Sequence, residues 1–346
     1  MMKDAYKELT VQFKINAASG GAAENAAPDA HIYGDAATAA ILVNAPDESW
    51  FYALSPERIN AIEYLPWNRD MDVLEIGALY GVYTGIADRV HSFDILEDNE
   101  DRRELIKARA GLFGHGNISF AKASAGRLYD AVIISLLDTG NDLKDPGEAI
   151  KTAAGSLKDG GWITVIADNE NALRYMTGAE REAGRAYVTE EDIISLADKN
   201  GLRLLNTYYP LNNASYARNI FSDGYMPGKG DFRGINESYS ESRYVLCSDE
   251  AIYAGLVGAG AFKDFAPSYV FVLSKASESI IEANTELMPV YAKYNRMRAP
   301  EYALKTEIFI SGGKKRVLKT ALTLEGCGHI EDFKKREDIL NKDLAG

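Results

Sequence analysis

Short apolar runs alternate with amphipathic segments through the first half of the chain. The apolar runs cover residues 72–76, 90–96, 117–123, 129–138 and 162–168, and their length and composition are typical of strands. The segments between them, 82–89, 100–112 and 146–161, are predicted as helices, and the last of these begins with a proline. Strands and helices in this alternation predict an α/β fold with a doubly wound, mostly parallel sheet.

The pattern becomes less regular after residue 168. Helices are predicted at about 190–200 and 248–258, with strands at 202–209 and 268–275, and these two strands are expected to pair as an antiparallel edge. Residues 304–322 alternate in polarity around a Ser-Gly-Gly turn, which predicts a β-hairpin. A polar helix is predicted at about 328–342.

Composition divides the chain into three parts. Residues 1–35 are rich in alanine and glycine and poor in large apolar side chains, which is typical of a flexible arm. Residues 36–280 contain the alternating elements and form the predicted Rossmann-like domain. Residues 281–346 are expected to form a small α+β appendage, a β-hairpin followed by a helix.

Charge and cysteine content exclude several classes of protein. The net charge of −13 over 346 residues argues against broad binding to nucleic acid or to anionic lipid. Two distant cysteines and four histidines without metal-ligand spacing argue against a disulfide framework and a metal site. No signal pattern and no apolar run of membrane-spanning length is present in the sequence, so we expect a cytoplasmic location without membrane insertion.

The stretch VLEIGALYGVYTG (residues 73–85) places glycines directly after the first predicted strand. In an open α/β sheet, ligands bind at the carboxyl ends of the strands, so this turn is the expected site. A dinucleotide fingerprint would require glycines where Leu79 and Val82 stand, and a P-loop would require a lysine after the last glycine. Both patterns fail.

A third pattern fits better. Glu75, Gly77 and Gly81 match the [DE]-x-G-x-G-x-G turn of class I S-adenosylmethionine-dependent methyltransferases, with Leu79 in place of the middle glycine. The segment LKDGGWITVI resembles the run that leads into their fifth strand. The chain therefore resembles this family. The resemblance implies S-adenosyl-L-methionine as cofactor and S-adenosyl-L-homocysteine as product.

The resemblance also implies positions for the site. In the family, an acid at the end of the second strand accepts both ribose hydroxyls, and Asp94, followed by Ile95, stands where that acid belongs. An acid after the third strand often holds the adenine amine. The stretch KASAG (residues 122–126) contains no acid, and Ser124 is the residue expected to form a hydrogen bond there instead. The expected cofactor-binding residues are thus Glu75, Gly77, Leu79, Gly81, Asp94, Ile95, Ser124 and Asp138. The expected catalytic residues are Asp138, Asn169 and Glu170, beyond the fourth and fifth strands.

Further stretches resemble a bacterial branch of the family associated with surface-polysaccharide synthesis, among them DNENALRYMTGAE and TYYPLNNASYARNIFSDGYMP. This resemblance implies a small-molecule or saccharide acceptor. Residues 304–333 are similar to the opening strands of a kinase-like domain, without its catalytic parts, and a packing or homodimer role is expected. A catalytically inactive, methyltransferase-like binding or scaffold protein is the alternative, because the middle glycine and the adenine-binding acid are missing.

Overall fold

The computed structural model describes residues 56–78, 80–112, 115–121, 126–137, 145–181, 185–233, 247–275, 287–295 and 303–322. Leu79, Ser124 and Asp138 lie outside the described residues, as do the predicted arm at 1–35 and the predicted helix at 328–342.

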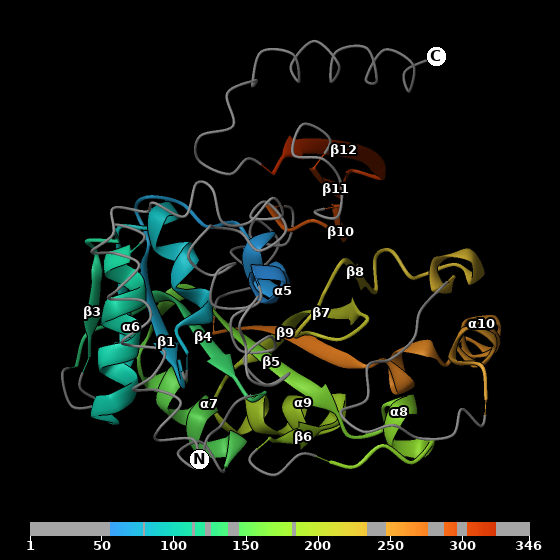
Figure 1. Cartoon of the computed structure of the whole chain (residues 1–346), viewed down its shortest axis with the longest axis horizontal. Helices are drawn as coiled ribbons and strands as arrows, with labels where there is room; N and C mark the ends of the chain where they lie inside the picture. The colour runs from blue at the N-terminus through green and yellow to red at the C-terminus, as the bar shows by residue number, and fades with distance from the viewer. Residues whose placement is uncertain are drawn as a thin grey trace, which may run out of the picture.

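The described strands form one sheet of twelve, in the order β12-β11-β10-β8-β7-β9-β5-β4-β1-β2-β3, with β6 paired to β5. Its parallel half contains β1 (Asp72–Ile76), β2 (Ser92–Leu96), β3 (Ile118–Phe120), β4 (Tyr129–Ser135) and β5 (Leu157–Asn169). The remaining strands are β6 (Tyr187–Val188), β7 (Arg203–Leu211), β8 (Asn219–Ser222), β9 (Ser268–Ser274), β10 (Tyr291–Asn295), β11 (Leu304–Ser311) and β12 (Lys314–Ala321). In Figure 1 the sheet runs from β3 at one end to β12 at the other. The predicted Rossmann-like fold is confirmed, as a mixed sheet in which the central strands are mostly parallel and antiparallel strands lie toward one edge.

Helices lie on both faces of this sheet. On one face, α7 (Pro146–Gly155), α9 (Glu190–Lys199), α10 (Asp249–Ala259) and the short η5 (Phe262–Phe265) cover a core that includes Leu74 and Tyr129. On the other, α5 (Asn60–Glu63), η3 (Val82–Arg89) and α6 (Glu100–Leu112) cover a core that includes Val73 and Phe93. Three short elements complete the described fold: η2 (Pro56–Ile59), α8 (Leu173–Met176) and η4 (Lys229–Phe232).

Local chemistry explains where the main helices begin. The Asp145 carboxylate accepts a hydrogen bond from the Gly147 N–H at 2.8 Å, and Pro146 follows it at the first position of α7. Thr189 and Asp192 form a capping box at the start of α9. The predicted helix at 146–161 is too long, because the chain enters β5 already at Leu157.

The antiparallel strand β9 is an interior strand. It pairs with β5 on one side and β7 on the other, antiparallel to both. The predicted antiparallel pairing of this strand with β7 is confirmed, and the antiparallel side of the sheet continues beyond β7 through β8, β10, β11 and β12. The residues of β9 are buried throughout, which requires neighbours on both faces and both sides.

The predicted hairpin at 304–322 is present as β11 and β12, joined at Gly312 and Gly313, both with positive φ. It continues the main sheet, since β10 pairs with both β11 and β8. Lys305 lies 3.7 Å from the Glu63 carboxylate, which further ties the hairpin to α5. The division of the chain at residue 280 stays a prediction.

Candidate functional site

The glycine turn follows β1 directly and is closed by its own backbone. The N–H of Gly81 donates to the carbonyl of Ala78, and both Gly77 and Gly81 have positive φ, at 81° and 63°. A Cβ added to Gly81 would lie 3.2 Å from the Ile106 side chain of α6. Glycine is therefore required at this position both for its backbone conformation and for the close approach of the helix.

The side chain of Glu75 lies beneath this turn in the interior. Glu75 is 1% exposed, and neither carboxyl oxygen has a hydrogen-bond partner among the described residues. Burial raises the pKa of Glu75 to about 8, against the lowering effect of Arg109 and Arg58 and with a further rise from Glu97. A buried carboxyl group without a hydrogen-bond partner is unfavourable, and a ligand with a cationic hydrogen-bond donor would stabilise it.

Two hydroxyl groups accompany Glu75 on the same face of the sheet. Glu75 is paired with Ile133 of β4, and side chains two residues apart on a strand share a face, so Ser135 at the end of β4 faces the same side. The hydroxyls of Ser135 and of Tyr83 on η3 are both buried, and the Tyr83 hydroxyl lies near Ser135 and Arg58. The carboxyl ends of β1 and β4 thus share a polar, sequestered region.

A buried ion cluster marks the end of β5. The carboxylate of Asp168 lies 2.7 Å from Arg174 and 3.0 Å from Arg185, and it accepts a hydrogen bond from the Ser268 hydroxyl at 2.8 Å. Burial by itself would raise the pKa of Asp168, but the two guanidinium groups outweigh it and hold the pKa below its ordinary value. Asp168 is therefore a fixed anion that joins β5, β9 and the segment after β5.

Asn169 and Glu170, the two predicted catalytic residues that the structure describes, differ in their surroundings. The Asn169 amide donates to the carbonyls of Asp264 and Ala266, and its oxygen accepts from the Asn171 N–H at 2.9 Å. These bonds occupy the amide group and give it a structural role at the loop before β9. Glu170 is half-exposed and pairs with Arg181 at 3.2 Å, so its carboxylate remains accessible from solvent.

Asp94 is not where the sequence placed it. It lies in the middle of β2, paired with Leu74, and therefore on the opposite face of the sheet from Glu75. Its carboxylate accepts hydrogen bonds from Ser119, Arg127 and Tyr129 at 2.6 to 2.8 Å. Ile95 is fully buried in the core. The predicted end of the second strand at Asp94 is corrected, because β2 continues for two residues beyond it, and a ribose-binding role for Asp94 stays a prediction.

Glu97 is a second acid near the carboxyl end of β2, and the sequence analysis did not single it out. It follows Leu96, the residue paired with Ile76, and so lies level with Gly77 at the carboxyl end of the sheet. Its carboxylate is buried, accepts from the Asn99 N–H at 2.9 Å and lies 3.3 Å from Arg102. In the sequence, Glu97 appears only as a second acid three residues after Asp94. The strand register is needed to show which of the two acids lies level with the glycine turn.

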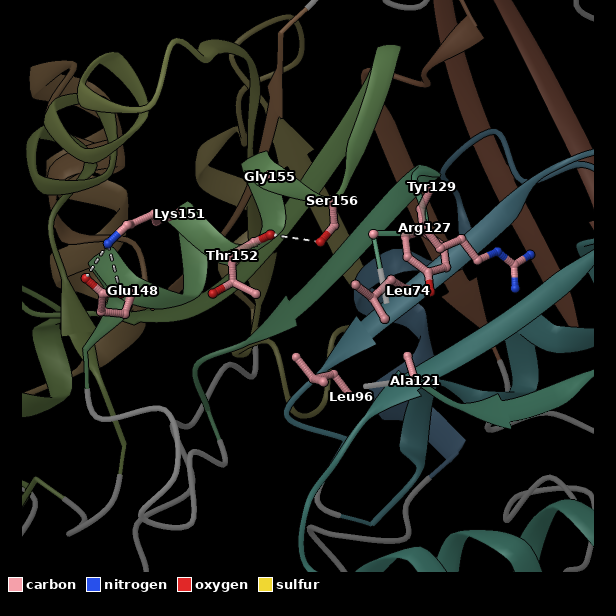
Figure 2. A pocket seen from close by; sticks show the side chains of 11 residues that line it. Leu74, Leu96, Ala121, Arg127, Tyr129, Glu148, Lys151, Thr152, Gly155 and Ser156 are labelled. Carbon is pink, nitrogen blue, oxygen red and sulfur yellow. Dashed lines mark hydrogen bonds and ion pairs between the residues drawn. The ribbon is translucent and has the colours of Figure 1, made fainter. Parts of the chain in front are cut away.

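A cavity of about 360 Å³ lies on the other face of the sheet. Figure 2 shows Leu74, Leu96 and Tyr129 on one side of it and the α7 residues Lys151 and Thr152 on the other. Leu74 precedes Glu75 and so points to the opposite face, which separates this cavity from the region beneath the glycine turn. Arg127 at its rim belongs to the Asp94 cluster.

No protein family model and no curated protein sequence matches the chain. The fold is similar to that of a chain in the complex between the Haloferax volcanii Trm112 methyltransferase activator and a methyltransferase (12% identity, TM-score 0.42, covering 69% of this chain and 98% of that chain). It is also similar to a SAM-dependent methyltransferase from Thermotoga maritima (16% identity, TM-score 0.42, covering 71% of this chain and 98% of that chain). A third is an S-adenosylmethionine-dependent methyltransferase from Clostridium acetobutylicum (12%, TM-score 0.39, 72% and 98%). These likenesses concern the course of the backbone.

The described residues contain neither a membrane-spanning helix nor a cluster of metal ligands. Within the described ranges, no helix is both long and apolar enough to cross a membrane. No group of three histidine, cysteine or carboxylate side chains among the same residues is arranged to hold a metal ion.

Proposed function

We propose that the chain is an S-adenosyl-L-methionine-dependent methyltransferase. The observation that carries the proposal is Glu75: a fully buried carboxyl group without a hydrogen-bond partner among the described residues, directly beneath a glycine turn at the carboxyl end of β1. The amino-acid end of the cofactor has an ammonium group that would satisfy it. The turn, with positive φ at Gly77 and Gly81, lets the backbone approach the nucleoside.

Other described residues fit the remaining parts of the cofactor. Glu97, level with Gly77, is the acid best placed to accept the ribose hydroxyls. Arg58 is a fully buried cation close to Glu75 and Tyr83, and it suits the carboxylate of the amino-acid end. The cofactor supplies an activated methyl group on a sulfonium, so the chemical demand on the protein is alignment and exclusion of water. The buried surroundings of Tyr83 and Ser135 meet that demand.

The acceptor proposed from the sequence resemblance is a small molecule or a saccharide, in a cytoplasmic step of surface-polysaccharide synthesis. Glu170 supports it as the described carboxylate with solvent access beside the end of β5, where it can take the proton of an acceptor hydroxyl. Asp138 remains a proposed partner in this task and lies outside the described residues. A homodimer through the C-terminal strands is likewise a proposal.

A specific observation favours a second candidate, a non-catalytic relative that keeps the fold as a binding or scaffold module. Glu97, the acid level with the glycine turn, already accepts a hydrogen bond from the Asn99 N–H at 2.9 Å and lies 3.3 Å from Arg102. In this second candidate, Glu75 and the glycine turn are retained from a methyltransferase ancestor, but they do not bind the cofactor.

Calorimetric titration with S-adenosyl-L-homocysteine separates the two candidates. We expect the purified chain to bind it with a Kd of about 1 to 100 μM, which corresponds to roughly 5 to 8 kcal/mol. Absence of binding at millimolar ligand contradicts the methyltransferase and supports the scaffold. Adenosine serves as control and is expected to bind more weakly, because it lacks the ammonium group that Glu75 would hold.

Two substitutions test which acid faces the ribose. Glu97→Ala is expected to weaken binding of S-adenosyl-L-homocysteine by about tenfold or more, since hydrogen bonds to a charged group contribute about 1.5 to 3 kcal/mol. Asp94→Ala is expected to leave this affinity unchanged and to lower the free energy of unfolding by about 2 kcal/mol, because Arg127 and Tyr129 lose their acceptor. Calorimetry and urea unfolding measure the two effects. If Asp94→Ala weakened binding and Glu97→Ala did not, Asp94 would be the acid that faces the ribose.

A further inference from the structure

Helix α6 packs on the glycine turn through two residues one helical turn apart. Ile106 lies where a Cβ on Gly81 would meet it. Arg109 reaches further, and its Nη1 donates a hydrogen bond to the carbonyl of Tyr80 at 2.9 Å. Arg109 is 7% exposed, which is low for an arginine. Its side chain is therefore directed to the turn and away from solvent.

The contact with Tyr80 orients a peptide plane at the proposed binding site. The carbonyl of Tyr80 and the N–H of Gly81 belong to one planar trans peptide, so they point in opposite directions. The N–H of Gly81 closes the turn on the carbonyl of Ala78. Arg109 thus holds one side of the plane while the turn's own hydrogen bond holds the other. A charged donor makes the stronger kind of hydrogen bond, which restricts rotation of this peptide.

Arg109 also acts on Glu75 through its charge. The charged and titratable groups that act on or respond to the Glu75 carboxyl are Arg109 from α6, Arg58 from η2, Tyr83 from η3 and Glu97 after β2. Burial and Glu97 favour the neutral acid, whereas Arg109 and Arg58 favour the carboxylate, with Arg109 the stronger of the two. The carboxylate is the form that binds an ammonium group.

We propose that Arg109 is a positioning residue of this site, which orients the peptide between Tyr80 and Gly81 for the cofactor and places a positive charge near Glu75. This inference rests on the proposed function, because the ligand for which the turn is prepared is the cofactor. It adds a residue of helix α6 to a site that the sequence placed only in the turn and at the strand ends.

The test compares Arg109→Met and Arg109→Lys with the wild-type chain. The ionisation of Glu75 is followed by ¹³C NMR, through the carboxyl resonance that is lost in Glu75→Gln. We expect its midpoint to rise by about one pH unit in Arg109→Met and to stay near the wild-type value in Arg109→Lys, which keeps the charge. Arg103→Met is the matched control on α6. Arg103 is partly exposed and pairs with Glu100, so its loss should leave the midpoint unchanged.

Affinity for S-adenosyl-L-homocysteine at pH 7 tests the orienting role. We expect Arg109→Met to bind about tenfold or more weakly. Arg109→Lys should recover only part of this loss, because lysine keeps the positive charge but lacks the planar guanidinium group. An unchanged Glu75 midpoint in Arg109→Met overturns the inference, as does wild-type affinity in both variants. If the wild-type chain binds no ligand, the proposed function fails, while the NMR titration still decides whether Arg109 favours the ionised Glu75.

Discussion

Glu75→Gln is expected to abolish measurable binding of S-adenosyl-L-homocysteine, with a loss of at least about a hundredfold. The neutral amide has the shape of the carboxyl group but cannot offer a negative charge to the ammonium. At pH 7 Glu75 is largely protonated in the unliganded chain, since burial raises its pKa to about 8. Binding of the ammonium form must therefore release a proton from Glu75. Titrations at pH 7 in two buffers of different ionisation enthalpy measure that proton.

The same substitution should change how stability depends on pH. The pKa of Glu75 is raised in the folded chain, so the unfolded chain loses this proton at lower pH, near the ordinary value of 4.5. Between about pH 4.5 and pH 8 the folded state holds the extra proton, and its stability falls as pH rises. The whole effect is on the order of 5 kcal/mol, from a shift of the pKa from 4.5 to about 8.

Urea unfolding of wild-type and Glu75→Gln chains at pH 5, 7 and 9 measures this dependence. The difference in free energy of unfolding between the two is expected to move in favour of the variant as pH rises to 8 and then to level off. Glu100→Gln, an exposed carboxylate on α6, is the matched control and should show no such change. A constant difference across the three pH values would contradict the buried ionisation of Glu75.

Asp168→Ala is expected to destabilise the folded chain more than any other substitution proposed for it. It removes the carboxylate between Arg174 and Arg185, whose side chains are 8% and 12% exposed, and leaves their charges without this partner. Breaking a buried pair in this way costs about 3 to 5 kcal/mol. Urea unfolding measures the loss, and a value below about 1 kcal/mol would show that the cluster does not hold the end of β5.

The pH dependence of Asp168 has the opposite sign to that of Glu75. Its pKa is lowered in the folded chain, so the stabilisation is present above the ordinary pKa of 3.8 and is lost as pH falls through the lower folded value. The wild type should therefore lose stability in acid relative to Asp168→Ala. Glu170→Ala breaks the exposed pair with Arg181 and should cost less than about 1 kcal/mol at any pH.

Local patterns predicted the elements that are long and strongly periodic. The helix at 100–112 has the predicted bounds as α6, and the first strand and the glycine turn stand where the sequence placed them. The short strands β8 and β10 were missed, because four or five residues in a segment rich in tyrosine and asparagine carry no clear period. The interior place of β9 was also missed, since pairing order is a long-range property.

The site was predictable only in part for the same reason. Glu75, Gly77 and Gly81 lie together in sequence and were found together in space. Asp94 lies inside β2 and Glu97 lies just after its end, so the end of the strand decides which of the two acids lies level with the glycine turn. Arg109 was not predicted, because a helix of ordinary composition gives no sign of which residue turns inward.

The sequence by itself determined the alternation of strands and helices, the glycine turn and the acid beneath it, since these depend on residues close together in the chain. The tertiary structure decided which groups surround that acid. Arg109, Arg58 and Glu97 come from three separate segments of the chain, and Asp168 contacts Ser268, which lies one hundred residues away on β9. The interaction energy between buried charges depends on their distance in space. The raised pKa of Glu75 and the ion pairs of Asp168 therefore arise only when the sheet is assembled.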